Sequence, residues 1–307
     1  MKIAIVGAGA MGSLFGGTLS NVAPVILLDP WREHVAAIRR DGLHIVELDG
    51  SERIVRVAAT DDPNEVGAVD LAIIFVKSRQ TEMAARWAKR FLREDGLALT
   101  LQNGLGNAET IAGVLGWQRT CSGVTAHGAT LLGPGRVRHA GQGPTHLATR
   151  PEIADRVAAV ADTFRRAGFE VHVSADLDSL VWGKLIINVG INALTAILRV
   201  PNGALAEIEA IDALMAAAVT EAVQVAEAKG IALPYPDPLQ RVREVCVATA
   251  ANRSSMLQDV LRGAPTEIDV INGAVVREGQ RLGIPTPTNR FLVQTIKAIE
   301  ASYGVRV

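Results

Sequence analysis

Three polar residues recur at a fixed interval in one of the most apolar stretches of the chain. Lys184, Asn188 and Asn192 are four positions apart in VWGKLIINVGINALTAIL, residues 181–198. On a helix this spacing places the three side chains in one row, here among Leu, Ile and Val. A buried lysine or amide needs a polar partner, so the row favours a site for a polar substrate. A structural ion pair of the lysine is the alternative.

Glycines near the N-terminus form a second chemical motif. Gly7, Gly9 and Gly12 make a GxGxxG pattern between an apolar strand-like run and a helix-like segment. In that context the first glycine permits a tight turn, the second lets a pyrophosphate approach the backbone, and the third lets the helix pack closely on the strand. Helix-start N–H groups then bind phosphate. The motif predicts a dinucleotide site that comprises Gly7, Ala8, Gly9, Ala10, Met11 and Gly12.

An acidic residue follows the second predicted strand. Asp29 lies 20 residues after Gly9, the spacing at which a carboxylate accepts hydrogen bonds from the adenosine ribose. This position favours NADH as the cofactor. Arg32 argues against this preference for NADH, because its side chain could neutralise the 2′-phosphate of NADPH. The alternative for Asp29 is a cap of the helix that follows Pro30.

The elements that must position these residues follow an α/β pattern and then a helical one. Parallel strands are predicted at 2–6, 25–28, 71–76 and 97–102, with helices at 13–20 and 81–91. A hairpin is predicted over 43–57, short antiparallel strands over 121–149, a helix over 152–167 and a strand over 170–173. We therefore expect an α/β fold, with a Rossmann dinucleotide-binding domain at 1–174 and an all-α substrate and catalytic domain at 175–307.

Composition narrows the classes of partner. The 307 residues include 31 Lys and Arg against 32 Asp and Glu, so no strong field steers the protein toward nucleic acid or an anionic membrane. Lys184 and the two amides would be costly in lipid, which favours a buried helix over a membrane span. Cys121 and Cys246 lack metal-ligand spacing, so we expect free thiols and no metal. The first apolar run is too short for a signal peptide, which predicts a cytoplasmic protein.

Several separate motifs, in order along the chain, resemble the ketopantoate reductase family (2-dehydropantoate 2-reductases). The resemblance covers essentially the whole sequence. It is carried by GAGAMG, VKSRQ, LQNGLGN, WGKLIINVGINALTAI, PNG, NRSSMLQDVLRGAPTEIDVINGAVV and GIPTPTN. One departure follows the second strand, where many family members have a basic residue suited to NADPH and this chain has DPWRE.

The resemblance implies a role for each matched residue. Lys184 would be the catalytic acid, and Glu267 would be the carboxylate that partners the lysine or the substrate. Lys77 and Asn103 would border the nicotinamide end of the site. The substrate would be held by Asn103, Asn188, Asn192, Asn202, Asn252 and Ser255. Simpler alternatives are an exposed loop charge for Lys77, turn residues for Asn103 and Asn202, and a helix cap for Ser255.

The expected reaction is NAD(P)H-dependent reduction of a 2-oxo acid, with ketopantoate and pantoate as substrate and product. Lys184 would donate the proton. A dehydrogenase on the same scaffold that acts on another 2-oxo or 2-hydroxy acid is one alternative, and a non-catalytic dinucleotide-binding redox sensor is another. Asp29 predicts a preference for NADH, whereas the family default is NADPH. The long apolar helices predict a homodimer.

Overall fold

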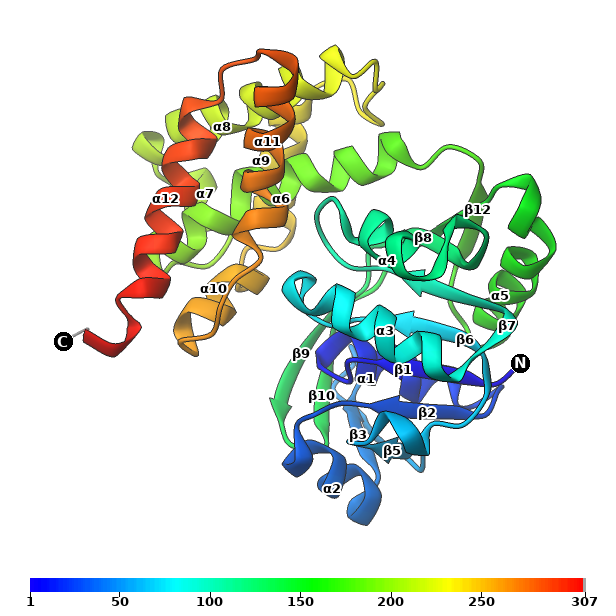
Figure 1. The fold of residues 1–307 in the computed structure, drawn as a ribbon. Helices are drawn as coiled ribbons and strands as arrows, with labels where there is room; N and C mark the ends of the chain where they lie inside the picture. Colours follow the sequence, from blue (N-terminus) through cyan, green and yellow to red (C-terminus); the bar gives the residue numbers. More distant parts are fainter. Residues whose placement is uncertain (306–307) are drawn as a thin grey trace. The chain divides into compact units, whose positions relative to one another are not determined.

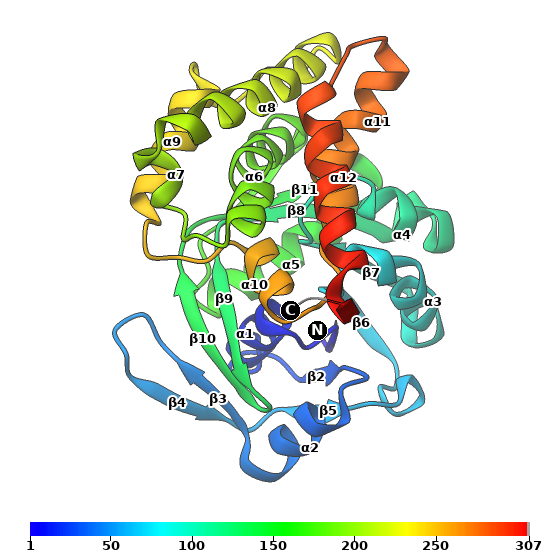
Figure 2. The same ribbon diagram turned by 90° about the vertical axis from the view of Figure 1, so that its left-hand side faces the viewer.

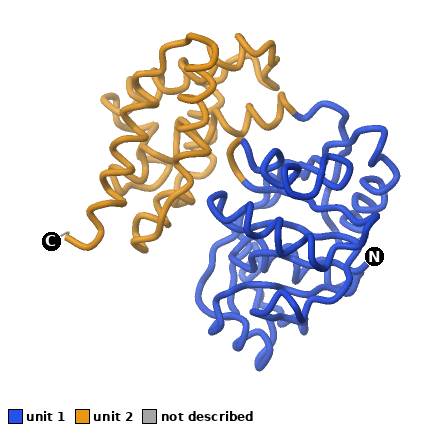
Figure 3. The backbone as a smooth tube through the Cα atoms, in the orientation of Figure 1, with its two compact units in different colours: residues 1–102, 106–177 blue, residues 103–105, 178–307 orange. Residues whose placement is uncertain are grey.

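The computed structural model describes residues 1–305, and the chain separates into two compact units. One unit comprises residues 1–102 and 106–177, and the other comprises 103–105 and the chain from 178 onward (Figure 3). The short segment 103–105 thus groups with the C-terminal unit although it directly follows a strand of the first unit in the chain. Each unit is described by itself below.

A sheet of eight strands forms the centre of the first unit (Figure 1). Its order is β12-β11-β8-β7-β6-β1-β2-β5, and all neighbours from β7 to β5 are parallel, as is the pair β7 and β8. The strands are β1 (Ile3–Val6), β2 (Val25–Leu28), β5 (Ala58–Thr60), β6 (Val69–Ile74), β7 (Leu92–Thr100), β8 (Thr120–Thr125), β11 (Thr145–Ala148) and β12 (Val171–Ser174). The order from β5 to β8 is that of a Rossmann fold, which confirms the predicted class.

Five α-helices connect the strands of this unit. Every side chain of β1 is buried, so the strand can occupy the middle of a sheet that is covered on both faces. The parallel strands bring the residues after β1, β2 and β6 to one edge of the sheet, where ligands bind in such folds. The helices are α1 (Ala10–Leu19), α2 (Arg32–Asp41), α3 (Thr81–Phe91), α4 (Asn107–Leu115) and α5 (Ala154–Arg166).

A second, smaller sheet has the order β4-β3-β10-β9. The predicted hairpin over 43–57 is confirmed by the antiparallel pair β3 (Leu43–Val46) and β4 (Glu52–Val55). The strands predicted after Cys121 also exist, but they divide between the two sheets. β9 (Gly128–Gly133) and β10 (Arg136–Gly141) pair with each other, and β10 then pairs in parallel with β3 (Figure 2). The predicted short antiparallel strands are confirmed by the antiparallel pairs β9 with β10 and β8 with β11, and β8 also extends the parallel sheet beside β7.

The second unit is helical, as predicted. Its central helix is α6 (Asp178–Leu198), which packs against α8, α9, α10 and α12. The other helices are α7 (Ala204–Glu207), α8 (Glu209–Ala228), α9 (Pro238–Ala248), α10 (Ser255–Leu261), α11 (Asn272–Leu282) and α12 (Pro287–Ala301). Among the described residues α6 alone is long and apolar enough to cross a membrane, and 67% of its most apolar window is buried. That burial is typical of a core helix.

Six short 3-10 helices connect these elements in the described part of the chain. They span Pro63–Glu65, Ser78–Gln80, Trp117–Arg119, Pro151–Ile153, Ile268–Val270 and Tyr303–Val305.

Candidate active site and dinucleotide cradle

The glycine-rich turn has the geometry of a phosphate cradle. Gly7 has φ of 95°, and a Cβ there would lie 2.6 Å from the Val76 nitrogen. A Cβ on Gly12 would lie 2.0 Å from the carbonyl oxygen of Gly7, so α1 and the turn pack together only with glycine at this position. Gly9 caps α1 and has open space around its missing Cβ. These residues fit a bound pyrophosphate, because the first N–H groups of α1 lack intrahelical partners.

Asp29 forms a turn at the end of β2. Its Oδ1 accepts a hydrogen bond from the Trp31 N–H at 2.9 Å, just before α2 begins at Arg32. The capping alternative was wrong, because the N-cap of α2 is Trp31 and no side chain caps the helix; the turn uses only one carboxylate oxygen of Asp29. Arg32 is exposed, and its Nε donates to Asp61 Oδ2 at 3.0 Å.

Lys77 is half-buried and directly precedes the 3-10 helix that follows β6.

The predicted row of polar residues lies on α6. Lys184 and Asn188 are half-buried and Asn192 is buried, in the middle of a helix whose other residues form the core of the unit. The Nδ2 atom of Asn188 is buried and has no hydrogen-bond partner among the described residues. An unsatisfied buried donor is costly, so this amide is suited to a ligand oxygen.

Burial changes the acidity of the lysine in this row. It lowers the pKa of Lys184 to about 8, and the negative charge of Glu267 opposes the shift by favouring the protonated form. Glu267 directly precedes the 3-10 helix Ile268–Val270 in the same unit. A lysine with a pKa near 8 can give up a proton during a reaction at neutral pH, which an ordinary surface lysine does far less readily.

Asn202 supports the turn that carries Asn252. Its N–H donates to the Asn252 carbonyl at 3.0 Å, and its Nδ2 donates to Thr249 Oγ1 at 2.9 Å. The Oδ1 of Asn202 is buried and has no hydrogen-bond partner in residues 1–305. The Asn252 side chain is exposed. Asn202 thus has the turn-forming contacts of the simpler alternative together with one buried acceptor that they leave unsatisfied.

Ser254, and not Ser255, caps α10. The Ser254 hydroxyl accepts from the Leu257 N–H at 3.0 Å and forms a hydrogen bond with Thr195 on α6 at 2.7 Å. The cap alternative for Ser255 was therefore wrong, because α10 begins at Ser255 itself, one residue earlier than that alternative assumed. Ser255 is half-buried in the first turn of α10.

The segment that contains Asn103 packs within the helical unit. Asn103 is half-buried, and the Leu105 N–H donates to the Val270 carbonyl at 3.0 Å. Gly104 has φ of 80°, and a Cβ there would lie 2.3 Å from the same carbonyl oxygen. The turn conformation at Gly104 therefore fixes the segment beside the residues that follow Glu267 in the chain.

Two features near the polar row were missed from the sequence. Tyr235 donates its hydroxyl to the Gly183 carbonyl at 2.6 Å, directly before Lys184. Burial raises the pKa of Tyr235 to about 12, so the phenol keeps the donated proton. Asn272 donates to Asn289 at 3.0 Å and to the Val189 carbonyl of α6 at 3.4 Å. The position of Tyr235 between two prolines was the sequence signal that could have indicated its role.

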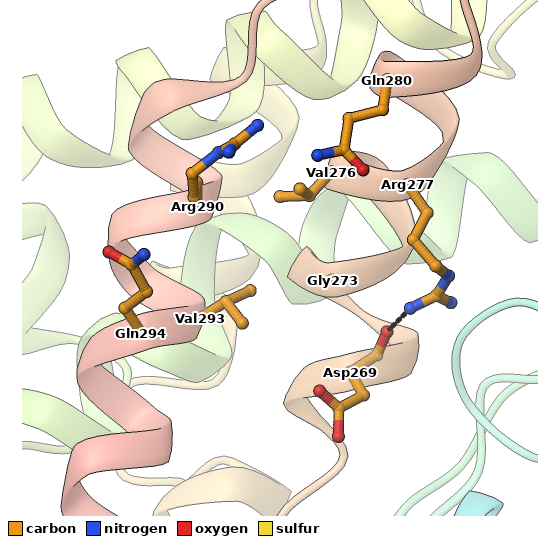
Figure 4. A pocket seen from close by; sticks show the side chains of 8 residues that line it. All are labelled: Asp269, Gly273, Val276, Arg277, Gln280, Arg290, Val293 and Gln294. Carbon is orange, nitrogen blue, oxygen red and sulfur yellow. Dashed lines mark hydrogen bonds between the residues drawn. The ribbon is translucent and has the colours of Figure 1, made fainter.

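Two open hollows on the surface of the described chain contain none of the predicted site residues. A groove of about 310 Å³ lies between α11 and α12, where the Arg277 guanidinium donates to the Asp269 carbonyl at 2.7 Å (Figure 4). It is lined by Asp269, Gly273, Val276, Arg277, Gln280, Arg290, Val293 and Gln294. A second hollow of about 400 Å³ lies where β6 and β7 begin, lined by Pro63, Asn64, Gly67, Ala68, Arg90, Phe91, Leu92 and Arg93. We assign neither hollow a part in the chemistry.

Both cysteines lie inside the fold. Cys121 and Cys246 are buried free thiols, and burial raises their pKa values to about 12 and about 11. Residues 1–305 contain no group of three or more His, Cys, Asp or Glu side chains arranged to hold a metal ion.

Two sequence-family models together match most of the chain. The model described as "Ketopantoate reductase PanE/ApbA" matches residues 3–152, and "Ketopantoate reductase PanE/ApbA C terminal" matches residues 176–300. The chain belongs to the ketopantoate reductase family. Membership in this family makes it an oxidoreductase with a small-molecule substrate, and the family is NAD(P)H-dependent.

Curated relatives agree with this assignment over their full length. A 2-dehydropantoate 2-reductase of Halobacterium salinarum is 41% identical over 299 residues, 97% of this chain and 98% of that protein. The 2-dehydropantoate 2-reductase of Pyrococcus horikoshii is 37% identical, and the match covers 99% of both chains. The resemblance first seen in the separate motifs is thereby confirmed.

Solved structures share the fold of this ketopantoate reductase family member. A PanE/ApbA family ketopantoate reductase from Ralstonia eutropha JMP134 is 38% identical with a TM-score of 0.90, over 98% of this chain and 99% of that one. A D-mandelate dehydrogenase, solved with NADH and anilino(oxo)acetate, is 32% identical with a TM-score of 0.91, over 99% and 100% of the two chains. Enzymes with this fold thus include a dehydrogenase that is named for mandelate and not for pantoate.

Proposed function

We propose that the chain reduces 2-dehydropantoate (ketopantoate) to pantoate with NAD(P)H. The observation that carries this proposal is a half-buried lysine with a pKa of about 8 in one row with two amides, one of which has an unsatisfied buried donor. Full-length relatives with the name 2-dehydropantoate 2-reductase supply the substrate. The lysine and amides are the groups that a ketone oxygen and a carboxylate would need.

In the proposed mechanism Lys184 is the general acid. Its Nζ donates a proton to the ketone oxygen, and its positive charge stabilises the negative charge that develops on that oxygen. Glu267 keeps the lysine protonated before the reaction. The reduced nicotinamide, when bound, supplies a hydride for the ketone carbon. The carboxylate, carbonyl and hydroxyl of the substrate would be held by Asn188, Asn192, Asn252 and Ser255, with Asn103 and Asn202 as further contacts.

We propose that residues 1–174 bind the dinucleotide and that residues 175–307 hold the substrate and catalytic groups. The glycine turn would bind the pyrophosphate, Asp29 the adenosine ribose, and Lys77 with Asn103 the nicotinamide end. The pair between Arg32 and Asp61 supports a preference for NADH, because Asp61 already neutralises the cation that a 2′-phosphate would need.

A second candidate is the reduction of an aryl 2-oxo acid. The similarity to D-mandelate dehydrogenase favours it, since that neighbour has a TM-score of 0.91 and its title names NADH. The redox-sensor alternative is less well supported, because a sensor has no need of a proton donor with a lowered pKa. We further propose a cytoplasmic homodimer without nucleic-acid or membrane partners.

The test is a panel of 2-oxo acids with NADH and NADPH, followed by the loss of reduced-nicotinamide absorbance. We expect ketopantoate to have the highest kcat/KM, and the Lys184→Ala variant to serve as the inactive control. A higher kcat/KM for an aryl 2-oxo acid such as phenylglyoxylate would support the second candidate instead. Normal dinucleotide binding without turnover of any 2-oxo acid would contradict both enzymatic proposals.

A further inference from the structure

An aromatic side chain stands beside the proposed ribose-binding carboxylate. Trp31 lies two residues after Asp29, and its N–H donates to Asp29 Oδ1 at 2.9 Å. Successive Cα atoms are about 3.8 Å apart, so the two Cα atoms lie within about 7.6 Å of each other. The indole remains 36% exposed, so part of the ring is accessible to a ligand.

The indole is held flat against a buried histidine. The Trp31 and His34 rings stack with centroids 5.1 Å apart and an interplanar angle of 7°. His34 is fully buried, so one face of the indole is covered by a ring that cannot itself move into solvent. This stack on a buried ring restrains the plane of the indole, and a restrained indole is suited to stack on another flat ring.

Hydrogen bonds fix the orientation and tautomer of His34. The Gly135 N–H donates to His34 Nδ1 at 3.0 Å, so Nδ1 is an acceptor and Nε2 carries the hydrogen. Nε2 then donates to Ser13 Oγ at 3.1 Å, since the Ser13 hydroxyl donates its own hydrogen to the Ala8 carbonyl at 2.7 Å. Burial lowers the pKa of His34, which maintains this neutral form, although Asp29 opposes the shift.

This chain of contacts joins the indole to the glycine-rich turn. Ala8 lies between Gly7 and Gly9, and Ser13 lies in the first turns of α1. The carboxylate proposed for the ribose, the exposed indole and the phosphate cradle are therefore linked within the first unit by hydrogen bonds and one ring stack. A nucleotide that lies across this group would have its phosphates at one end and its base at the other.

We propose that Trp31, supported by buried His34, is the platform on which the adenine ring of the dinucleotide stacks. The inference rests on the dinucleotide part of the proposed function. Adenine is attached to the ribose that Asp29 would bind, so the base must lie within one sugar of that carboxylate. An indole presents a large apolar face to a neutral aromatic base, and base stacking of this kind needs no charged partner. The sequence signal was the W of DPWRE, which we interpreted only as part of a departure from the family pattern.

Binding of ADP-ribose, measured by calorimetry, tests the platform without any turnover. This ligand contains the adenine, ribose and pyrophosphate but no nicotinamide. We expect Trp31→Ala to weaken ADP-ribose binding on the order of tenfold, and Trp31→Phe to retain most of the affinity because phenylalanine still stacks. Trp117→Ala is the matched control: Trp117 is also exposed, but it precedes β8 and contacts Arg150, so its loss should leave the affinity unchanged.

Tryptophan fluorescence supplies a second readout. ADP-ribose should quench the emission of the wild type and of Trp117→Ala, and this quenching should be largely lost in Trp31→Phe although the variant still binds. Equal ADP-ribose affinity in the wild type and in folded Trp31→Ala, or quenching that survives in Trp31→Phe, would overturn the platform. Either result would leave 2-oxo acid reduction intact, whereas a wrong substrate proposal would leave ADP-ribose binding intact, so the two failures can be told apart.

Discussion

At the residue scale, the chemistry of the proposed site depends on how Lys184 is kept reactive. Burial among apolar residues of α6 lowers its pKa, and the negative charge of Glu267 limits the fall. The two effects leave the lysine protonated at neutral pH and yet able to donate. Asn188 and Asn192, one and two turns further along α6, have the spacing to bind a molecule that also contacts the lysine.

The pH profile tests this balance. Because the acid must be protonated, we expect kcat/KM to fall as the pH rises above about 8, the pKa of Lys184. Glu267→Gln removes the charge that raises the pKa, so the fall should begin at lower pH. The measurement is kcat/KM for ketopantoate across the pH range for both proteins. An unchanged profile in the variant would exclude Glu267 from the site.

We also expect single residues to determine the preference between NADH and NADPH. We expect the wild type to prefer NADH by roughly ten- to hundredfold in kcat/KM, because the Asp29 carboxylate would repel the 2′-phosphate of NADPH. Asp29→Ala should reduce that ratio. If the wild type prefers NADPH the prediction fails, and if the ratio is the same in Asp29→Ala, the carboxylate serves only the turn with Trp31.

At the scale of elements, helices with a strong periodic pattern could be predicted from the sequence, whereas the pairing of strands far apart in the chain could not. The helix α3 was predicted with its observed limits, and the polar row on α6 follows directly from a spacing of four. The parallel pairing of β3 with β10 joins segments about ninety positions apart, and local pattern holds no information on such a partner. The start of α10 was misplaced by one residue because two adjacent serines are equally good caps by type.

The two serines form a matched pair for an experiment. Ser254→Ala removes the cap of α10 and the bond to Thr195, so we expect a loss of about 1–2 kcal/mol in the free energy of unfolding. Ser255→Ala should leave stability nearly unchanged and raise the KM for the 2-oxo acid. Denaturant unfolding and steady-state kinetics of both variants check this. A stability loss in Ser255→Ala alone would reverse the two roles.

At the scale of the whole molecule, the sequence predicted a Rossmann unit and a helical unit, together with the residues that each contributes to the proposed site. It did not predict that 103–105 groups with the helical unit, since that depends on the contact of Gly104 and Leu105 with Val270. It also missed the contact of Trp31 with His34, because the buried partner of an exposed aromatic residue is set by the packing of α1, α2 and the Gly135 turn.

We propose that this chain binds a dinucleotide in one unit and uses Lys184 of the other as the proton donor for a 2-oxo acid. The most direct test compares Lys184→Ala with the wild type in ketopantoate reduction and in NADH binding. We expect kcat to fall on the order of 10²-fold or more, with NADH affinity nearly unchanged, because the proton is needed only in the transition state. Near wild-type kcat in the variant would contradict the account.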